Sequence, residues 1–171
     1  YTTYLQLYGE RHTNVASILN VKGNLQKKRG NLAAARECYN HALRIYDELN
    51  GSHRSSGAVN VLNNLASLYS AEGQMELAGS SYFEALNIAR TLYAPCNPTI
   101  ALILNNIGAM YEKQEENQLA QDYFRQAVEM RQALFGERNK NTALSLGNLS
   151  LSFAKLGKAI EAEAYCKKAV E

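Results

Sequence analysis

Three asparagines recur at nearly equal spacing and are the side chains best suited to recognise another molecule. Asn20, Asn63 and Asn105 are separated by 43 and 42 residues. Asparagine is less favourable than alanine inside a helix by about half a kcal/mol, so its repetition there needs a reason. An amide offers both donors and an acceptor, and a row of amides can bind the backbone of an extended peptide with little regard to its sequence. We therefore predict that this row contacts a ligand.

A second row of asparagines follows one residue further along the chain. Asn64, Asn106 and Asn148 share the same spacing. Their amides could bind a ligand as well, or they could form hydrogen bonds between neighbouring structural repeats. We assign the first row mainly to ligand binding and this second row mainly to structure.

Catalytic and metal-binding motifs do not accompany these amides. The sequence contains no G-x-S-x-G, G-x-G-x-x-G, phosphate-loop or H-E-x-x-H pattern. Its three histidines, His12, His41 and His53, fall at a helix start, on a helix surface and in a loop, which makes a poor metal site. The small-residue loop 51–57 could hold an anion at a helix start, although a plain connector is the simpler interpretation. We predict no enzymatic activity, no cofactor and no metal site.

Three cysteines, Cys38, Cys96 and Cys166, complete the reactive side chains. Their number is odd, and none lies in C-x-x-C spacing. This pattern fits reduced thiols of a cytoplasmic protein better than a disulfide framework or a zinc site. Cys38 and Cys166 fall inside expected helices, where we predict that they are small buried side chains.

The composition indicates a folded, all-helical chain. Among 171 residues, 46 % are hydrophobic, two are proline, and the formal net charge is +2. Abundant alanine, leucine, asparagine and glutamine without alternating β-branched residues favour helices. No apolar run approaches the ~18 residues that a membrane span needs. Neither nucleic acid nor a membrane is a predicted partner, because the charge is near zero and no basic stripe with interleaved aromatics occurs.

A long internal period supplies the framework that would position the amides. Four leucines, Leu19, Leu62, Leu104 and Leu146, are separated by 43, 42 and 42 residues. The same pattern returns around each leucine, with a small residue four positions later and two invariant alanines further on. Those alanines are Ala35, Ala78, Ala120 and Ala162, followed by Ala42, Ala85, Ala127 and Ala169.

Each period reads as two amphipathic helices joined by a tight turn. Leu62, Leu65, Ala66 and Tyr69 follow the i, i+3, i+4, i+7 spacing of one helix face, and Gly73 can take the left-handed conformation that ends a helix. The first helix of each pair, helix A, is expected near 13–29, 56–72, 98–114 and 140–156, and its partner, helix B, near 32–49, 75–92, 117–134 and 159–171. Predicted N-caps are His12, Ser55, Asn97 and Asn139.

These pairs divide the chain into four repeats of a single array. Residues 1–8 read as the end of a preceding helix B, and the last residues stop inside a helix, so we expect a fragment of a longer protein. The repeats are predicted at 13–49, 56–92, 98–134 and 140–171.

These residues resemble the tetratricopeptide repeat (TPR), and the 42-residue form found in kinesin light chains is the most similar variant. Leu62-Asn63-Asn64-Leu65-Ala66-Ser67-Leu68-Tyr69 and its counterpart starting at Leu104 are similar to helix A of that form. The resemblance implies a right-handed α-solenoid of antiparallel helix–turn–helix units, with A helices lining a concave groove. The sequence departs from the pattern at Lys22 and Gln26, at the turn residue Glu115, and at Gly147, which replaces the asparagine.

In that arrangement, helix A residues outside the core stripe face the groove and would bind a peptide. Lysines near one end of the A helices favour a ligand that carries Asp, Glu or a free carboxylate, whereas Leu102 and Leu144 near the other end could receive an apolar side chain. Solvated helix ends, where lysine complements the helix dipole, are the alternative. The predicted peptide-binding residues are Asn20, Asn24, Lys27, Asn60, Asn63, Ser67, Asn105, Lys113, Leu151 and Lys155.

The sequence therefore predicts a protein-interaction scaffold that binds an extended, acidic segment of a protein partner. Two alternatives stay open. The repeats could be a regulatory arm of a larger enzyme, NTPase or transcription factor that contacts another domain of the same chain. Weak self-association through the ends of the repeat array is the other.

Overall fold

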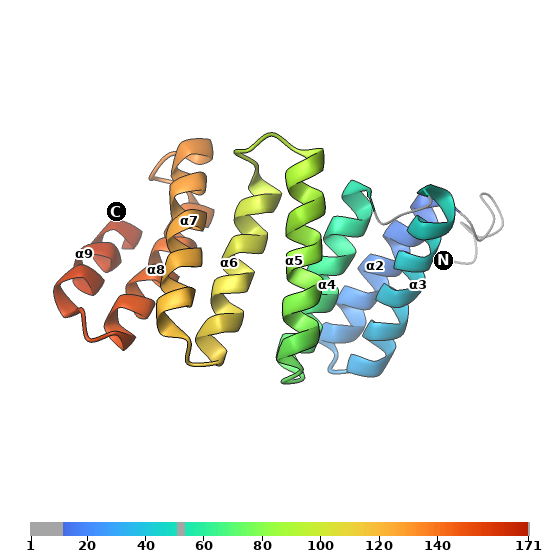
Figure 1. Ribbon diagram of the computed structural model, residues 1–171, viewed down its shortest axis with the longest axis horizontal. Coiled ribbons are helices and arrows are strands. Elements are labelled where there is room, and N and C mark those ends of the chain that lie inside the picture. Colours follow the sequence, from blue (N-terminus) through green and yellow to red (C-terminus); the bar gives the residue numbers. More distant parts are fainter. Residues whose placement is uncertain (1–11, 51–53, 171) are drawn as a thin grey trace. The chain divides into compact units, whose positions relative to one another are not determined.

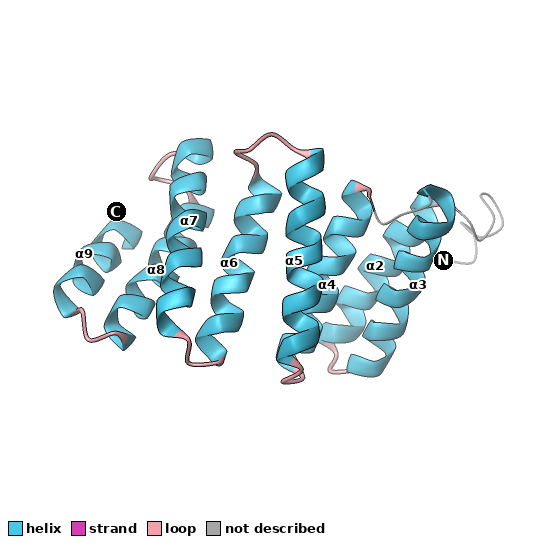
Figure 2. Ribbon diagram, viewed as in Figure 1, coloured by secondary structure: helices cyan, strands magenta, loops and turns pink. Residues whose placement is uncertain are grey.

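Eight α-helices make up the part of the chain that the structure describes, residues 12–50 and 54–170 of a computed structural model (Figure 1). Within those residues every regular element is a helix (Figure 2). The A helices are α2 (Thr13–Lys28), α4 (Ser56–Ala71), α6 (Pro98–Lys113) and α8 (Lys140–Lys155). The B helices are α3 (Leu32–Asn50), α5 (Met75–Leu92), α7 (Asn117–Phe135) and α9 (Ala159–Val170). Each begins at its predicted residue and ends within one residue of its predicted end. The predicted helix over residues 1–8 lies outside the described residues.

Two compact units divide the helices. Unit 1 (Tyr1–Leu92) contains α2 to α5, and unit 2 (Tyr93–Glu171) contains α6 to α9. In each unit the two helices of a repeat pack against each other, the first helix B contacts the second helix A, and the two A helices also touch. The all-α helical-repeat fold is therefore confirmed, while the single continuous array stays a prediction.

Side-chain caps start the A helices at the four predicted residues. Asn97 Oδ1 accepts the Thr99 N–H at 2.8 Å, and Asn139 Oδ1 accepts the Asn141 N–H at 2.8 Å. Ser55 Oγ accepts the Ala58 N–H at 3.1 Å. His12 Nδ1 does the same for Asn14. These bonds satisfy amide groups that a helix start otherwise leaves without a partner.

The turns between A and B helices depend on one residue with positive φ. Gly73 has φ 78°, as predicted, and Gly30 and Gly157 behave alike. The corresponding residue of the third repeat is Glu115, with φ 63°. A side chain with Cβ is disfavoured in this region, so the third turn carries strain that the glycine turns avoid.

Close helix approach explains the small residue four positions after each key leucine. A Cβ on Gly23 would lie 2.5 Å from the Tyr39 ring, and one on Gly108 would lie 2.7 Å from the Phe124 ring. Tyr39 and Phe124 are fully buried, and each fills the space between its A and B helices.

The two helix cysteines differ. Cys38 is buried, as predicted, and burial raises the pKa of its thiol. Cys166 is exposed, so the prediction of burial was wrong there. It lies on α9, which contacts only α8 within the described residues and so leaves most of its surface uncovered.

Candidate functional site: the A-helix faces

Asparagines of neighbouring A helices pair across unit 1. Asn64 Nδ2 donates to Asn20 Oδ1 at 2.9 Å, and both residues are half-buried. The bond links α2 to α4, which confirms the inter-repeat role predicted for Asn64. It uses only the acceptor of Asn20, whose Nδ2 donates no hydrogen bond to another described residue.

The same pair recurs in unit 2. Asn148 Nδ2 donates to Asn105 Oδ1 at 3.1 Å, and thereby links α8 to α6. Asn105 Oδ1 also accepts the Ser145 hydroxyl at 3.0 Å. Its Nδ2, like that of Asn20, makes no hydrogen bond within the described residues. Each unit therefore has one half-buried amide whose oxygen bonds to the next repeat and whose nitrogen remains available to donate.

Asn63 differs from the other two members of its row. Only 7 % of it is exposed, and it already has an interaction partner. Asn60, one turn earlier on α4, is exposed and forms no hydrogen bond within the described part of the chain. Of the predicted α4 residues, Asn60 is thus more accessible than Asn63.

Two further predicted residues bond to tyrosines of their own repeats. The Tyr39 hydroxyl donates to Asn24 Oδ1 at 2.7 Å, and Tyr82 forms the equivalent hydrogen bond with Ser67. Burial raises the pKa of each tyrosine to about 12, and at Tyr82 the Ser67 bond offsets part of that rise.

The third repeat shows that this bond leaves a trace in the sequence. Phe124 replaces the tyrosine, and Ala109 stands where Asn24 and Ser67 stand in the first two repeats. Where helix B has a tyrosine, helix A has a polar side chain opposite it. Where helix B has a phenylalanine, helix A has an alanine. This matched exchange was visible in the sequence and would have predicted a structural bond for both residues.

The lysines of the two units have different partners. Lys27 Nζ of α2 donates to Ser67 Oγ of α4 at 2.7 Å, and Lys27 has a further interaction partner. Lys155 Nζ of α8 lies 2.9 Å from Glu112 Oε1 of α6, an ion pair that neutralises it. Lys113 is exposed. The positive charge that could attract an acidic ligand is therefore reduced at Lys155.

Exposed leucines are concentrated on the A helices of unit 2. Leu102, Leu144 and Leu151 are 41 %, 57 % and 50 % exposed. Leu102 and Leu144 lie in the first half of α6 and α8, at the position that Ser17 and Asn60 occupy in unit 1. At these two aligned positions unit 2 is apolar and unit 1 polar, whereas α2 of unit 1 exposes Val21 and Leu25 at other positions.

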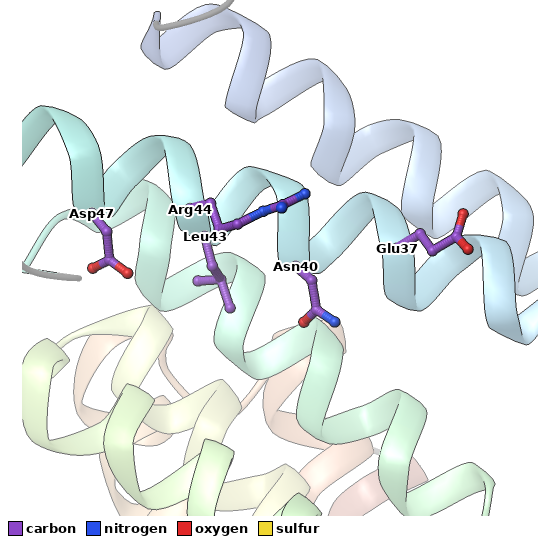
Figure 3. Close-up of a pocket in the computed structure, with 5 residues that line it drawn as sticks. All are labelled: Glu37, Asn40, Leu43, Arg44 and Asp47. Carbon is purple, nitrogen blue, oxygen red and sulfur yellow. The ribbon is translucent and has the colours of Figure 1, made fainter.

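A hollow of about 500 Å³ lies on the B-helix side of unit 1. Figure 3 shows its side chains, which extend from successive turns of α3. Opposite charges alternate along this helix, and all the lining residues belong to it, which is typical of a solvated helix surface. The residues are Glu37, Asn40, Leu43, Arg44 and Asp47.

Among the described residues, no group of three or more His, Cys, Asp or Glu side chains could hold a metal ion. No helix there is long and apolar enough to cross a membrane.

Comparison with known families identifies the repeat. One model of the tetratricopeptide repeat matches residues 57–133 and 99–171, and a second model of the same repeat matches residues 16–48. The chain belongs to the tetratricopeptide repeat family, as the sequence resemblance predicted. No protein among the curated proteins matches it.

Solved structures share the fold. BtubC (BKLC) from P. vanneervenii is 28 % identical with a TM-score of 0.83 over 90 % of this chain and 61 % of its own. The TPR-like repeats of a protein assigned as a kinesin light chain from Podosopora anserina are 14 % identical, with a TM-score of 0.76 over 98 % of this chain and 79 % of that one.

A Rap protein complexed with Competence and Sporulation Factor is 19 % identical, with a TM-score of 0.79 over 92 % of this chain and 43 % of its own. The chain thus spans about three fifths of BtubC and less of the Rap protein. Family and fold together define a protein-interaction scaffold of the α-solenoid class.

Proposed function

We propose that this scaffold binds an extended, acidic or carboxylate-bearing peptide segment of a protein partner on its A-helix faces. The observation that carries the proposal is the asparagine pair found in each unit. Asn64 and Asn148 fix the orientation of Asn20 and Asn105 through the amide oxygen, and they leave the amide nitrogen as a donor. A donor held in place loses little conformational freedom when a ligand binds.

Peptide carbonyl groups are the acceptors that suit these two donors. An extended backbone presents a carbonyl at every residue whatever its side chains. Recognition through Asn20 and Asn105 would therefore be tolerant of sequence, and selectivity would come from the side chains around them.

Lysines and leucines supply that selectivity. Half-buried Lys27 and exposed Lys113 favour an acidic segment, each contributing less than ~1 kcal/mol. Lys155 would have to exchange its ion pair with Glu112 for one with the ligand, which lowers its contribution. Leu151, together with Leu102 and Leu144, receives an apolar side chain, which is the usual source of affinity. Asn24, Asn60, Asn63 and Ser67 complete the proposed contact residues.

Calorimetry with capped nonapeptides tests the proposal. One peptide would carry alternating Glu and Leu, a second Gln and Leu, and a third Lys and Leu. We expect the acidic peptide to bind more tightly than the glutamine peptide by about tenfold at low salt, and by less at ~1 M salt, where charges are screened. Equal affinities for the three peptides, or a preference for the lysine peptide, would refute the acidic specificity. Absence of binding by all three would refute the peptide-docking function.

A further inference from the structure

A buried arginine in unit 2 has no acidic partner among the described residues. Arg131, near the end of α7, is only 7 % exposed. Two hydrogen bonds hold the guanidinium, and Nη1 donates both. One goes to the Asn141 carbonyl oxygen at 2.7 Å and the other to Ser145 Oγ at 2.6 Å. Both acceptors are neutral. Nε and Nη2 make no hydrogen bond, and no carboxylate pairs with the guanidinium, within the described residues.

Burial without a counter-charge is unfavourable for a guanidinium. It lowers the pKa of Arg131, and burial is the sole cause of that shift. The repeat itself does not require the charge, since the same position holds Tyr46 and Ala89 in the first two repeats. The two hydrogen bonds of Arg131 link α7 to α8, but neither neutral acceptor balances the positive charge, and this uncompensated charge points to an anionic ligand.

A pocket of about 240 Å³ gives access to this arginine. Arg131 lines it together with the start of α6, the end of α7 and the start of α8. Leu102 and Phe135 on its wall are 41 % and 39 % exposed, so the pocket opens to solvent beside apolar side chains. The positive ends of the α6 and α8 dipoles also favour a negative charge there. The other lining residues are Pro98, Thr99 and Asn141.

We propose that this pocket binds a carboxylate of the partner, with Nε and Nη2 of Arg131 donating to its two oxygens and Leu102 and Phe135 contacting an adjoining apolar group. The planar guanidinium fork matches a carboxylate. A single cation beside an apolar wall suits one negative charge better than the higher charge of a phosphate. The identification of a peptide as the source rests on the proposed function, whereas the carboxylate site stands without it.

Isobutyrate is a small probe that combines a carboxylate with an apolar group. We expect it to shift the ¹⁵Nε–¹Hε resonance of Arg131, assigned by its loss in Arg131→Lys, with a dissociation constant of about the millimolar range. Isobutyramide, which has the same shape without the charge, should leave that resonance unmoved. The proposal is overturned if isobutyrate moves the resonance no more than isobutyramide does, or if inorganic phosphate binds more tightly.

Leu102→Glu tests the site without removing Arg131. Because Leu102 lines the same pocket, the new carboxylate would occupy the place of the ligand. Relative to Leu102→Gln, we expect it to raise Tm by about 2–4 °C and to abolish the isobutyrate shift. Leu102→Gln should still show the shift, weakened by the loss of apolar contact. Equal Tm values and equal shifts for the two variants would contradict the proposal.

Three hexapeptides distinguish the source of the carboxylate and separate this proposal from the peptide-docking function. One ends in Leu with a free carboxylate, the second ends in Leu-amide, and the third is capped with an internal Glu-Leu. A free terminal carboxylate should bind about ten- to a hundredfold more tightly than the amide, as expected for a charge-assisted pair; tighter binding of the internal Glu would assign the site to a side chain. Binding of isobutyrate but of no peptide would leave the carboxylate site intact and refute the docking function. Peptide binding that leaves the Arg131 resonance unmoved would refute the site alone.

Discussion

The A-helix faces of the two units share one asparagine pair and differ in what surrounds it. In unit 1, Asn20 accepts a single hydrogen bond, from Asn64. In unit 2, Asn105 accepts two, because Ser145 also donates to it and is held in turn by Arg131. Asn20 therefore forms one isolated hydrogen bond, whereas Asn105 is the last acceptor of a buried polar network that starts at Arg131.

This difference teaches that the repeat specifies the pair, while other positions of both helices specify its environment. On helix A, Ser145 of α8 stands where α4 has Val61. The residue aligned with Arg131 in the first repeat is Tyr46, whose hydroxyl lies 3.3 Å from Ser17 Oγ. A single exchange on helix B therefore changes a neutral contact into a buried positive charge. We expect selectivity for partners to reside in such exchanges.

The largest effect is expected where unit 2 is given a side chain that belongs to unit 1. Phe124→Tyr places a hydroxyl in a fully buried position opposite Ala109, which cannot accept it. A buried hydroxyl without a partner should lower the free energy of unfolding by about 2 kcal/mol, measured by urea denaturation. Adding Ala109→Ser recreates the Tyr82–Ser67 combination and should recover about 1 kcal/mol. A double variant no more stable than Phe124→Tyr alone would contradict the matched exchange.

Removing the shared amide sharpens the comparison next. Asn105→Ala deprives both Ser145 and Asn148 of their acceptor, whereas Asn20→Ala deprives Asn64 only. We expect losses of about 2 and about 1 kcal/mol in the free energy of unfolding, since each orphaned polar group adds a cost. Equal losses in the two variants would mean that the Ser145 bond contributes nothing to stability.

The turns of the two units should respond in opposite ways. Glu115→Gly relieves the positive-φ strain of the third turn and should raise the free energy of unfolding by about 1 kcal/mol. Gly73→Ala introduces the same strain in unit 1 and should lower it by a similar amount. Thermal denaturation of the two variants checks both signs, and a destabilised Glu115→Gly would refute the strain.

The smallest effect concerns the ion pair of unit 2. Glu112→Gln removes the partner of Lys155, and because the lysine is partly exposed, we expect a loss below ~1 kcal/mol that shrinks as salt is added. The same variant frees a positive charge and should strengthen binding of the acidic nonapeptide. Weaker binding would contradict the competition between Glu112 and the ligand.

Sequence periodicity was sufficient for the fold. Cap residues and turn glycines mark helix ends locally, so helix bounds such as Thr13–Lys28 followed from the leucine spacing and from His12. The exposure of Cys166 did not follow, because burial depends on which helices cover α9 and not on its own pattern.

The candidate site was only partly visible in the sequence. The inter-repeat role of Asn64 and Asn148 was predicted. Their partners are Asn20 and Asn105, which belong to the row assigned to the ligand and occupy a repeat position one residue earlier. Such a bond depends on how two helices are displaced along their axes, which spacing within one helix does not encode. Arg131 escaped notice because a lone arginine on helix B looks like a surface residue, although Tyr46 and Ala89 at the aligned positions were a signal of burial.

The most direct test of the account replaces only the amide nitrogens that are left to donate. Asn20→Asp and Asn105→Asp keep the oxygen that accepts from Asn64 or Asn148 and remove the Nδ2 donor, and Asn87→Asp on the exposed surface of α5 controls for the added charge. Calorimetry should show the Gln-Leu nonapeptide, which has no charge to be repelled, bound about tenfold more weakly by each of the first two variants. The Asn87→Asp control should match the wild type, with Tm nearly constant in all three. Wild-type affinity in both Asn20→Asp and Asn105→Asp would show that these amides hold the repeats together and do not bind the partner.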